Sequence, residues 1–257
     1  MLGNIRKYGK PPYRIVVIHG GPGSIGSLGY MAEKIAKICG VIEPLQSKYS
    51  VAALIDELFE QLKCNSQLPI ILLGHSWGAW LAMMYTARYP QNVKALILIG
   101  TPPLEDKYVS CIMDKRISNL STHDAACLQE LLNSESAISI TEMEKLIYKC
   151  DNCFPLPKSI TDQYVLFTDY QMNQTVWGEA AEMRTKGEMC QLINQIKCPI
   201  HLIHGEYDPH PFEGVIEPFK THGVVCSEYV LPHCGHSPFY ERKRFTEFYS
   251  IIADIII

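Results

Sequence analysis

The sequence lacks three features that would point to particular partners: an excess of positive charge, a long apolar run and an internal repeat. Its 257 residues include 23 Lys and Arg against 27 Asp and Glu, which gives a net charge of −4. A nucleic-acid-binding surface needs a basic stripe or patch, and the sequence shows none. No stretch approaches the roughly 18 apolar residues that a membrane-spanning helix requires. We therefore expect neither a nucleic acid nor a membrane as a partner.

Targeting signals and cofactor motifs are also scarce. The N-terminal residues MLGNIRKYGK lack the apolar core of a secretory signal peptide. Ten cysteines in a chain without such a signal indicate reduced thiols and a cytoplasmic protein rather than a disulfide framework. Cys150 and Cys153 have C-x-x-C spacing, but they lie in a polar, proline-bounded stretch and not at the end of a strand. We expect no metal and no cofactor.

What the sequence does contain is an alternation of β-branched runs and helical patterns, in a composition that is 47% hydrophobic. The runs lack polar alternation, which is typical of parallel strands buried on both faces. Strands are predicted over residues 12–18, 40–44, 68–73, 93–100, 199–204 and 224–230. Helices are predicted over residues 27–39, after an N-cap at Ser50, over 79–88 and from about 238 to the end. This order predicts an α/β fold with a parallel sheet.

The alternation stops between residues 102 and 195. This stretch contains no convincing strand, two helix-prone segments at 125–132 and 141–149, and helix breakers at Pro155 and Pro157. We interpret residues 102–196 as a helical insertion and residues 1–101 and 197–257 as the core into which it is inserted.

The most specific motif is Gly74–His75–Ser76–Trp77–Gly78, which reads G-x-S-x-G between a predicted strand and a predicted helix. In this context the serine occupies a strained backbone position with its hydroxyl exposed. A side chain on either glycine would clash across the tight bend. The motif predicts that Ser76 is a nucleophile.

A serine hydroxyl becomes reactive when a neighbouring base, usually a histidine oriented by a carboxylate, takes its proton. In folds with this turn the acid and then the histidine follow the serine along the chain. Asp208 follows the predicted strand 199–204, and His236 follows the next strand. Glu206 is the rival acid, but it comes too soon after the strand. We predict Asp208 as the acid and His236 as the base.

Three other histidines allow alternatives. His75 lies inside the turn, where it lines the site or simply packs, and we interpret it as a packing residue. His210 and His233 lie near the same sheet edge as His236, which is the arrangement that a zinc site would use. We favour the catalytic interpretation of His236 over the zinc site.

The reaction also needs hydrogen-bond donors for the oxyanion that develops on the substrate. The main-chain N–H of Trp77, directly after the nucleophile, is one candidate, and the loop after the first predicted strand supplies the other. That loop reads His19–Gly20–Gly21–Pro22, and glycine lets the backbone approach a substrate closely. The loop contains neither G-x-G-x-x-G nor G-K-[ST], which argues against a phosphate loop.

With these motifs in order, the chain resembles the α/β-hydrolase superfamily, and HGGPG at 19–23 with Ser76–Trp77–Gly78 resembles its proline iminopeptidase branch. The resemblance covers residues 13–101 and 197–257. It implies an α/β-hydrolase fold with a helical cap, the triad Ser76, Asp208 and His236, and the N–H groups of Gly21 and Trp77 as oxyanion donors. It implies no cofactor.

The chain departs from that branch in ways that bear on the fold and the substrate. Only a dozen residues precede the strand at Tyr13, so we expect the first hairpin to be missing and the sheet to have about six strands. The iminopeptidases hold the free amine of the substrate with glutamates of the cap, and Glu179 and Glu182 are possible equivalents or solvated helix charges. Trp177 is either a wall of an apolar pocket or a core residue.

Together these residues predict a serine hydrolase that cleaves an ester or amide bond of a small-molecule or short peptide substrate through an acyl-enzyme. The alternative is a non-catalytic ligand-binding protein with the same fold. Dehalogenases and epoxide hydrolases share this fold, but they carry aspartate where this chain has Ser76. The acyl group, the leaving group and the oligomeric state are left open.

Overall fold

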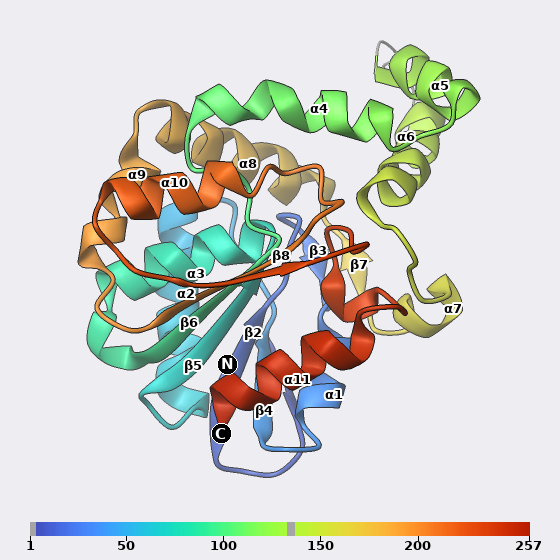
Figure 1. Ribbon diagram of the computed structural model, residues 1–257. Helices are drawn as coiled ribbons and strands as arrows, with labels where there is room; N and C mark the ends of the chain where they lie inside the picture. The colour runs from blue at the N-terminus through green and yellow to red at the C-terminus, as the bar shows by residue number, and fades with distance from the viewer. Residues whose placement is uncertain (1–3, 133–136) are drawn as a thin grey trace.

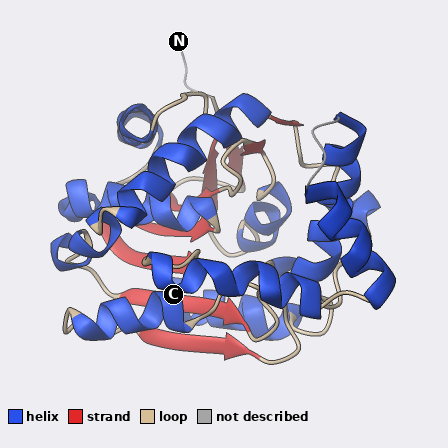
Figure 2. Ribbon diagram, turned by 90° about the horizontal axis from the view of Figure 1, so that it is seen from above, coloured by secondary structure: helices blue, strands red, loops and turns tan. Residues whose placement is uncertain are grey.

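The computed structural model describes residues 4–132 and 137–257, and within them the chain forms a central sheet covered by helices on both faces (Figures 1 and 2). The sheet has seven strands in the order β1-β4-β2-β5-β6-β8-β9. Every neighbouring pair is parallel except β1 and β4, which run antiparallel. The strands are β1 (Ile5–Tyr8), β2 (Tyr13–Ile18), β4 (Gly40–Pro44), β5 (Ile70–His75), β6 (Val93–Ile99), β8 (Ile200–Gly205) and β9 (Ser227–Leu231). The predicted mostly parallel α/β sheet is confirmed.

The sheet has one strand more than the six that we expected, and the additional strand is β1. Its four residues pair with β4, from Ile5 opposite Pro44 to Tyr8 opposite Val41. This edge strand could not be recognised in the sequence, because Arg6 and Lys7 interrupt any apolar pattern. Its position is set instead by pairing with the distant strand β4. Since β4 lies between β1 and β2, these two consecutive strands do not form a hairpin with each other.

The apolar strands bury both of their faces, which explains why their sequences do not alternate. In β5, Ile70 and Leu72 pack in one hydrophobic cluster, while Ile71 and Leu73 pack in the other. Helices α2 (Val51–Asn65), α3 (Trp77–Arg88) and α10 (Glu213–Thr221) cover the first face, and α1 (Gly29–Ile35) and α11 (Phe245–Ile256) cover the second. Ser50 caps α2 as predicted, since its side chain accepts the N–H of Ala53 over 3.3 Å.

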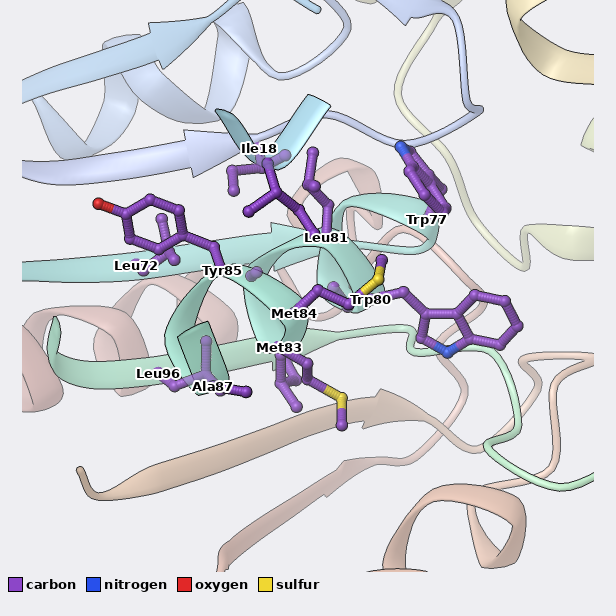
Figure 3. Close-up of a cluster of buried hydrophobic side chains, with 14 of the residues drawn as sticks. Ile18, Leu72, Trp77, Trp80, Leu81, Met83, Met84, Tyr85, Ala87 and Leu96 are labelled. Carbon is purple, nitrogen blue, oxygen red and sulfur yellow. The ribbon is translucent and has the colours of Figure 1, made fainter. Parts of the chain in front are cut away.

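Helix α3 is the most deeply buried of these helices. All of its residues from Trp77 to Ala87 are buried, and their side chains fill the space between the sheet and the neighbouring helices (Figure 3). A helix that is apolar on every side is stable only in such a place. The turn that carries Ser76 is therefore held by a helix that is buried along almost its whole length.

The segment between β6 and β8 is mainly helical, as predicted. It contains α4 (Val109–Ser118), α5 (Thr122–Leu132), α6 (Ala137–Asp151), α7 (Lys158–Thr161), α8 (Tyr170–Thr185) and α9 (Glu188–Gln191). Helix α4 runs above the sheet, and α5 and α6 project to one side (Figure 1). Helix α8 buries Met172, Val176 and Ala180 in the same cluster as α2 and α3. We refer to this segment as the helical insertion; its boundaries at 102 and 196 stay a prediction.

The expectation that this insertion contains no strand was wrong in one place. Residues Phe167–Thr168 form the short strand β7, which pairs antiparallel with β3 (Ser24–Ile25) in the loop after β2. Two residues are too few to show a period-2 pattern, so only the contact across the fold reveals the pair. This pair ties the insertion to the glycine-rich loop.

The C-terminal apolar segment forms α11, preceded by a 3₁₀ turn over Pro238–Tyr240. Its Phe248 and Ile252 are buried in the cluster that also contains residues of α1. Across residues 4–132 and 137–257, no helix combines the length and the apolar character needed to cross a membrane.

Candidate active site

Ser76 lies at the junction of β5 and α3, in the sharp turn that its motif predicts. Its backbone has φ 54° and ψ −124°, a region that non-glycine residues rarely adopt. A Cβ on Gly74 would lie 2.2 Å from the carbonyl oxygen of Gly78, and a Cβ on Gly78 would lie 2.2 Å from that of Ile18. Both glycines are therefore required by close approach of the backbone, and the turn presents Ser76 above the sheet edge.

The glycine-rich loop after β2 lies directly against this turn. A Cβ on Gly20 would be 3.2 Å from the Cβ of Ser76. Gly21 has φ 114°, and a Cβ there would lie 2.7 Å from the main-chain nitrogens of Gly23 and Ser24. A side chain at position 20 would therefore disturb the approach of the loop to the serine, and one at position 21 would disturb the loop itself.

Gln46 joins the loop to the turn, and the sequence did not indicate this role. Its side chain donates to the carbonyl of His19 over 3.2 Å and accepts the indole N–H of Trp77 over 2.9 Å. His19 is fully buried beside it, and burial lowers the pKa of its imidazole to about 4. The two hydrogen bonds of Gln46 therefore fix the spacing between the glycine-rich loop and the turn that carries Ser76.

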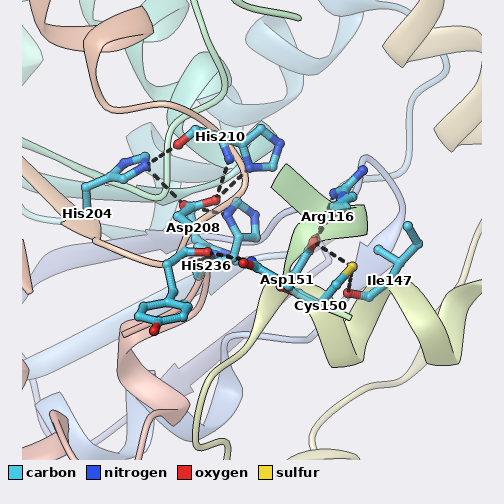
Figure 4. A network of polar contacts seen from close by, with 12 residues as sticks. Arg116, Ile147, Cys150, Asp151, His204, Asp208, His210 and His236 are labelled. Atoms are coloured by element: carbon cyan, nitrogen blue, oxygen red, sulfur yellow. Dashed lines mark hydrogen bonds and ion pairs between the residues drawn. The ribbon is translucent and has the colours of Figure 1, made fainter. Parts of the chain in front are cut away.

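Asp208 and His236 are in direct contact. His236 Nδ1 lies 2.8 Å from Asp208 Oδ2 (Figure 4). The rival carboxylate, Glu206, instead accepts the main-chain N–H of His233 over 3.1 Å. The acid that follows β8 at the predicted position is therefore the one that reaches the histidine after β9.

The surroundings of Asp208 and His236 shift the pKa values of both residues in opposite directions. Burial alone would raise the pKa of Asp208, but the imidazoles around it hold that pKa well below its usual range. Burial alone would lower the pKa of His236, but the charge and hydrogen bond of Asp208 raise it above its ordinary value. The carboxylate is ionised, and it makes His236 a stronger base than a free imidazole.

Two more histidines contact the same carboxylate, and both were missed as partners of Asp208 from the sequence. His210 Nδ1 lies 2.9 Å from Asp208 Oδ1, and His204 Nε2 lies 3.3 Å from Asp208 Oδ2 (Figure 4). The signal that could have found His210 is its position two residues after the acid, where a side chain can fold back. His204 belongs to β8 and reaches the same loop from the strand below.

His75 packs as predicted, and it also lines the site. Its ring lies 4.8 Å from the rings of His236 and Phe239, and its Nε2 is 3.0 Å from the carbonyl oxygen of His236. Burial, assisted by the charge of His236, lowers the pKa of His75 to about 3. A neutral imidazole at this position supports the loop that carries His236.

The helical insertion reaches the site through a partly buried ion pair. Arg116 of α4 donates two hydrogen bonds to the carboxylate of Asp151, over 2.8 and 2.7 Å (Figure 4). The carbonyl of Asp151 in turn accepts the main-chain N–H of His236 over 2.6 Å. Sequence reasoning missed both residues, because nothing local links positions 116 and 151 to residue 236.

Ser76 and His236 line one cavity of about 720 Å³ between the core and the helical insertion. Gly21, His75, His210 and Trp177 line the same cavity. Its apolar lining residues from the insertion are Val109, Ile112, Met113, Ile147, Val165 and Trp177. Its other lining residues from the insertion are Arg116, Tyr148, Asp151, Lys158, Thr161 and Asp162, so the insertion covers the serine with an apolar patch and a polar one.

The aromatic and acidic residues suggested as substrate contacts fall into two groups. Trp177 lines the cavity and stacks on Trp80 with ring centroids 5.4 Å apart. Glu179 and Glu182 are not among the lining residues. Glu179 accepts the main-chain N–H of Val51 over 2.7 Å, and Glu182 pairs with Lys186 over 2.7 Å. Their carboxylates are committed to the N-terminus of α2 and to an exposed helix pair, away from the serine.

The described residues offer one grouping whose donor atoms are close enough to hold a cation. Asp208, His210 and His236 have donor atoms within 4.8 Å of one another. Both carboxylate oxygens and the two Nδ1 atoms already contact each other, so a cation would have to displace those contacts. All ten cysteines lie in the described ranges and each is a free thiol, Cys150 and Cys153 included.

Comparison with known proteins places this geometry in a family. The family model described as alpha/beta hydrolase fold matches residues 36–243. The proline iminopeptidase of Clostridioides difficile (strain 630) is 31% identical over 140 residues, which cover 49% of this chain and 47% of the relative. The human monoacylglycerol lipase ABHD6 is 26% identical over 195 residues, which cover 75% of this chain and 56% of the lipase. The chain spans about half the length of these curated relatives.

Solved structures agree with this at the level of the fold. The structure of VinJ superposes with a TM-score of 0.73 at 19% identity, covering 98% of this chain and 93% of VinJ. The proline iminopeptidase of Mycobacterium smegmatis superposes with a TM-score of 0.67 at 18% identity, covering 98% of this chain and 93% of the peptidase. The turn around Ser76 and the sheet that carries it agree with the family match. This chain belongs to the α/β hydrolase fold family, because the family model matches residues 36–243.

Proposed function

We propose that this protein is a serine hydrolase that cleaves an ester or amide bond of a small-molecule or short peptide substrate through an acyl-enzyme. Ser76 is the nucleophile, His236 the general base, and Asp208 the carboxylate that orients the base. The observation that carries the proposal is the 2.8 Å contact between His236 Nδ1 and Asp208, made by a histidine that lines the same cavity as Ser76.

The chemistry follows from the orientation of the imidazole. Because Nδ1–H donates to Asp208, the neutral ring carries its lone pair on Nε2. That nitrogen takes the proton of Ser76 as Oγ attacks the substrate carbonyl, and then returns it to the departing alkoxide or amine. The same nitrogen then deprotonates the water that releases the acyl group, while the ionised Asp208 stabilises the imidazolium.

The main-chain N–H groups of Gly21 and Trp77 are the proposed oxyanion donors. Trp77 is the first residue of α3, and the first N–H groups of a helix have no partner within it. The loop that carries Gly21 is supported against Ser76 through Gly20. One such donor contributes about 10²–10³ in rate in comparable enzymes.

The lining of the cavity favours an ester with an apolar acyl group. Val109, Ile112 and Met113 line the cavity from α4 and fit an aliphatic chain. A free substrate amine would need a carboxylate in the cavity. Two carboxylates of the described residues line it: Asp151 is occupied by Arg116, and Asp162 accepts the hydroxyl of Thr161 over 3.2 Å. Trp177 remains the proposed wall of the substrate site. A cytoplasmic location is part of the same proposal and rests on the ten free thiols.

A fluorophosphonate probe and a substrate panel test the proposal together. The wild-type protein should label covalently and hydrolyse nitrophenyl esters, with a preference for medium over acetyl chains. Ser76→Ala should not label, and its kcat should fall by about 10⁶. Ser27→Ala removes another hydroxyl from the cavity lining and should label and turn over as the wild type does.

One result would contradict the proposed hydrolase activity, and another would contradict only the preference for esters. Tight binding of a small ligand without labelling or turnover would support the non-catalytic alternative. A strong preference for proline anilide over all esters, lost in Glu179→Gln, would support the peptidase activity that the Clostridioides relative's name describes.

A further inference from the structure

The carboxylate of Asp208 is shared between two imidazoles. Oδ2 lies 2.8 Å from His236 Nδ1, and Oδ1 lies 2.9 Å from His210 Nδ1. The two rings are stacked at an angle, with centroids 4.5 Å apart. The proposed mechanism uses only one of these histidines, so the second requires an explanation.

His210 is held to Asp208 by more than its ring. Its main-chain N–H also donates to Asp208 Oδ1 over 2.9 Å, and its carbonyl oxygen lies 2.7 Å from His204 Nε2. The side chain is buried, with 6% of the residue exposed. Two donors from one residue therefore fix Oδ1, while the strand below fixes the backbone of that residue.

We infer that His210 is a positioning residue for the hydrolysis proposed above: by donating from Nδ1 to Oδ1, it locks the Asp208 carboxylate with Oδ2 directed at His236. With the main-chain N–H of His210 as its one donor, Oδ1 could still shift as the carboxylate rotates about its terminal torsion, which is broad. Pinning Oδ1 removes that freedom and so fixes the plane in which His236 is held. The inference rests on the proposed roles of Ser76, Asp208 and His236.

His210 also weakens the effect of the Asp208 charge on the pKa of His236. A donor on Oδ1 withdraws part of the negative charge of Asp208, which is the charge that raises the pKa of His236. The other titratable or charged groups around the pair are His204 on β8, His75 at the end of β5, Arg116 on α4 and Asp151 on α6. Loss of the imidazole therefore raises the pKa of His236.

Two substitutions of His210 separate this role from simple packing. The amide nitrogen of Asn is the same number of bonds from Cβ as Nδ1, whereas that of Gln matches Nε2. His210→Asn should keep a donor for Oδ1 and retain kcat/KM within a few-fold. His210→Gln should lower kcat/KM by about 10–100-fold, the cost of a slightly misplaced catalytic group. In His210→Gln, the acid limb of the plot of kcat/KM against pH should also move to higher pH.

Controls keep the outcome unambiguous. His201→Gln changes a histidine of β8 that packs on Tyr229 outside this cluster, and it should behave as the wild type. Thermal unfolding of each variant shows whether it is folded at the assay temperature. Equal kcat/KM and an unshifted acid limb in folded His210→Gln would overturn the inference while leaving the proposed function intact. A wild-type protein that neither labels with fluorophosphonate nor turns over would instead overturn the proposed function.

Discussion

The main-chain N–H of His236 donates to the main-chain carbonyl of Asp151 over 2.6 Å, so the histidine proposed as the base is held by the last residue of α6. Asp151 is itself held by two hydrogen bonds from Arg116 of α4. The insertion is therefore more than a cover over the cavity, because its helices also contribute to the position of the base.

Arg116→Gln should lower kcat/KM by roughly tenfold, because it removes both hydrogen bonds that hold Asp151. The charge of Arg116 lowers the pKa of His236, so its loss should also move the acid limb of kcat/KM to higher pH. Steady-state rates from pH 5 to 9 test both effects. Lys145→Gln, which breaks an exposed pair with Glu142 on α6, is the control and should change neither.

Asp208→Asn should reduce kcat/KM by about 10⁴, because the imidazole loses the carboxylate that sets its tautomer. Since that carboxylate raises the pKa of His236, the acid limb should move to lower pH in this variant. Glu206→Gln removes the neighbouring acid that contacts His233 and should leave the pH profile unchanged. A larger loss of kcat/KM in Glu206→Gln than in Asp208→Asn would mean that Glu206, and not Asp208, is the acid.

Two glycine substitutions of identical chemistry should have opposite effects on stability. In Gly78→Ala the new Cβ would lie 2.2 Å from the carbonyl oxygen of Ile18, so backbone must move, and we expect a loss of about 3 kcal/mol. In Gly178→Ala the Cβ meets nothing within 4 Å on the exposed side of helix α8, and we expect a gain of about 1 kcal/mol. Urea unfolding measures both, and equal stabilities would contradict the close packing at the turn.

Buried histidines should make the protein less stable in mild acid. Burial lowers the pKa of His19 to about 4, below the ordinary value of 6.5. As the pH falls from 6.5 toward 4, the unfolded chain binds a proton that the folded chain excludes. The free energy of unfolding should fall by up to about 1.4 kcal/mol per pH unit for this residue.

His19→Gln should reduce that slope by the same amount, as measured by urea unfolding at several pH values. The matched control is His123→Gln, because His123 is exposed on α5. A slope that is unchanged in the His19 variant would show that other groups cause the acid sensitivity.

Local chemistry was sufficient to predict the parallel sheet and the turn at Ser76. Strands that bury both faces must be apolar throughout, and Gly74 and Gly78 are required by contacts within a few residues of the serine or with the adjacent strand. The order of Ser76, Asp208 and His236 could be read for the same reason, since each follows a recognisable strand. The seventh strand and the β3–β7 pair could not, because two to four residues carry no periodic signal.

The sequence by itself determined the scaffold, the strained serine and the direct contact expected between Asp208 and His236. Only the tertiary structure decided that His210 shares this carboxylate, that Asp151 holds the backbone of His236, and that Glu179 lies outside the cavity. The physical reason is that burial patterns and tight turns depend on residues that are close together in the sequence. The partners of a buried polar group are instead chosen by whichever distant segments the packed core brings within hydrogen-bond distance.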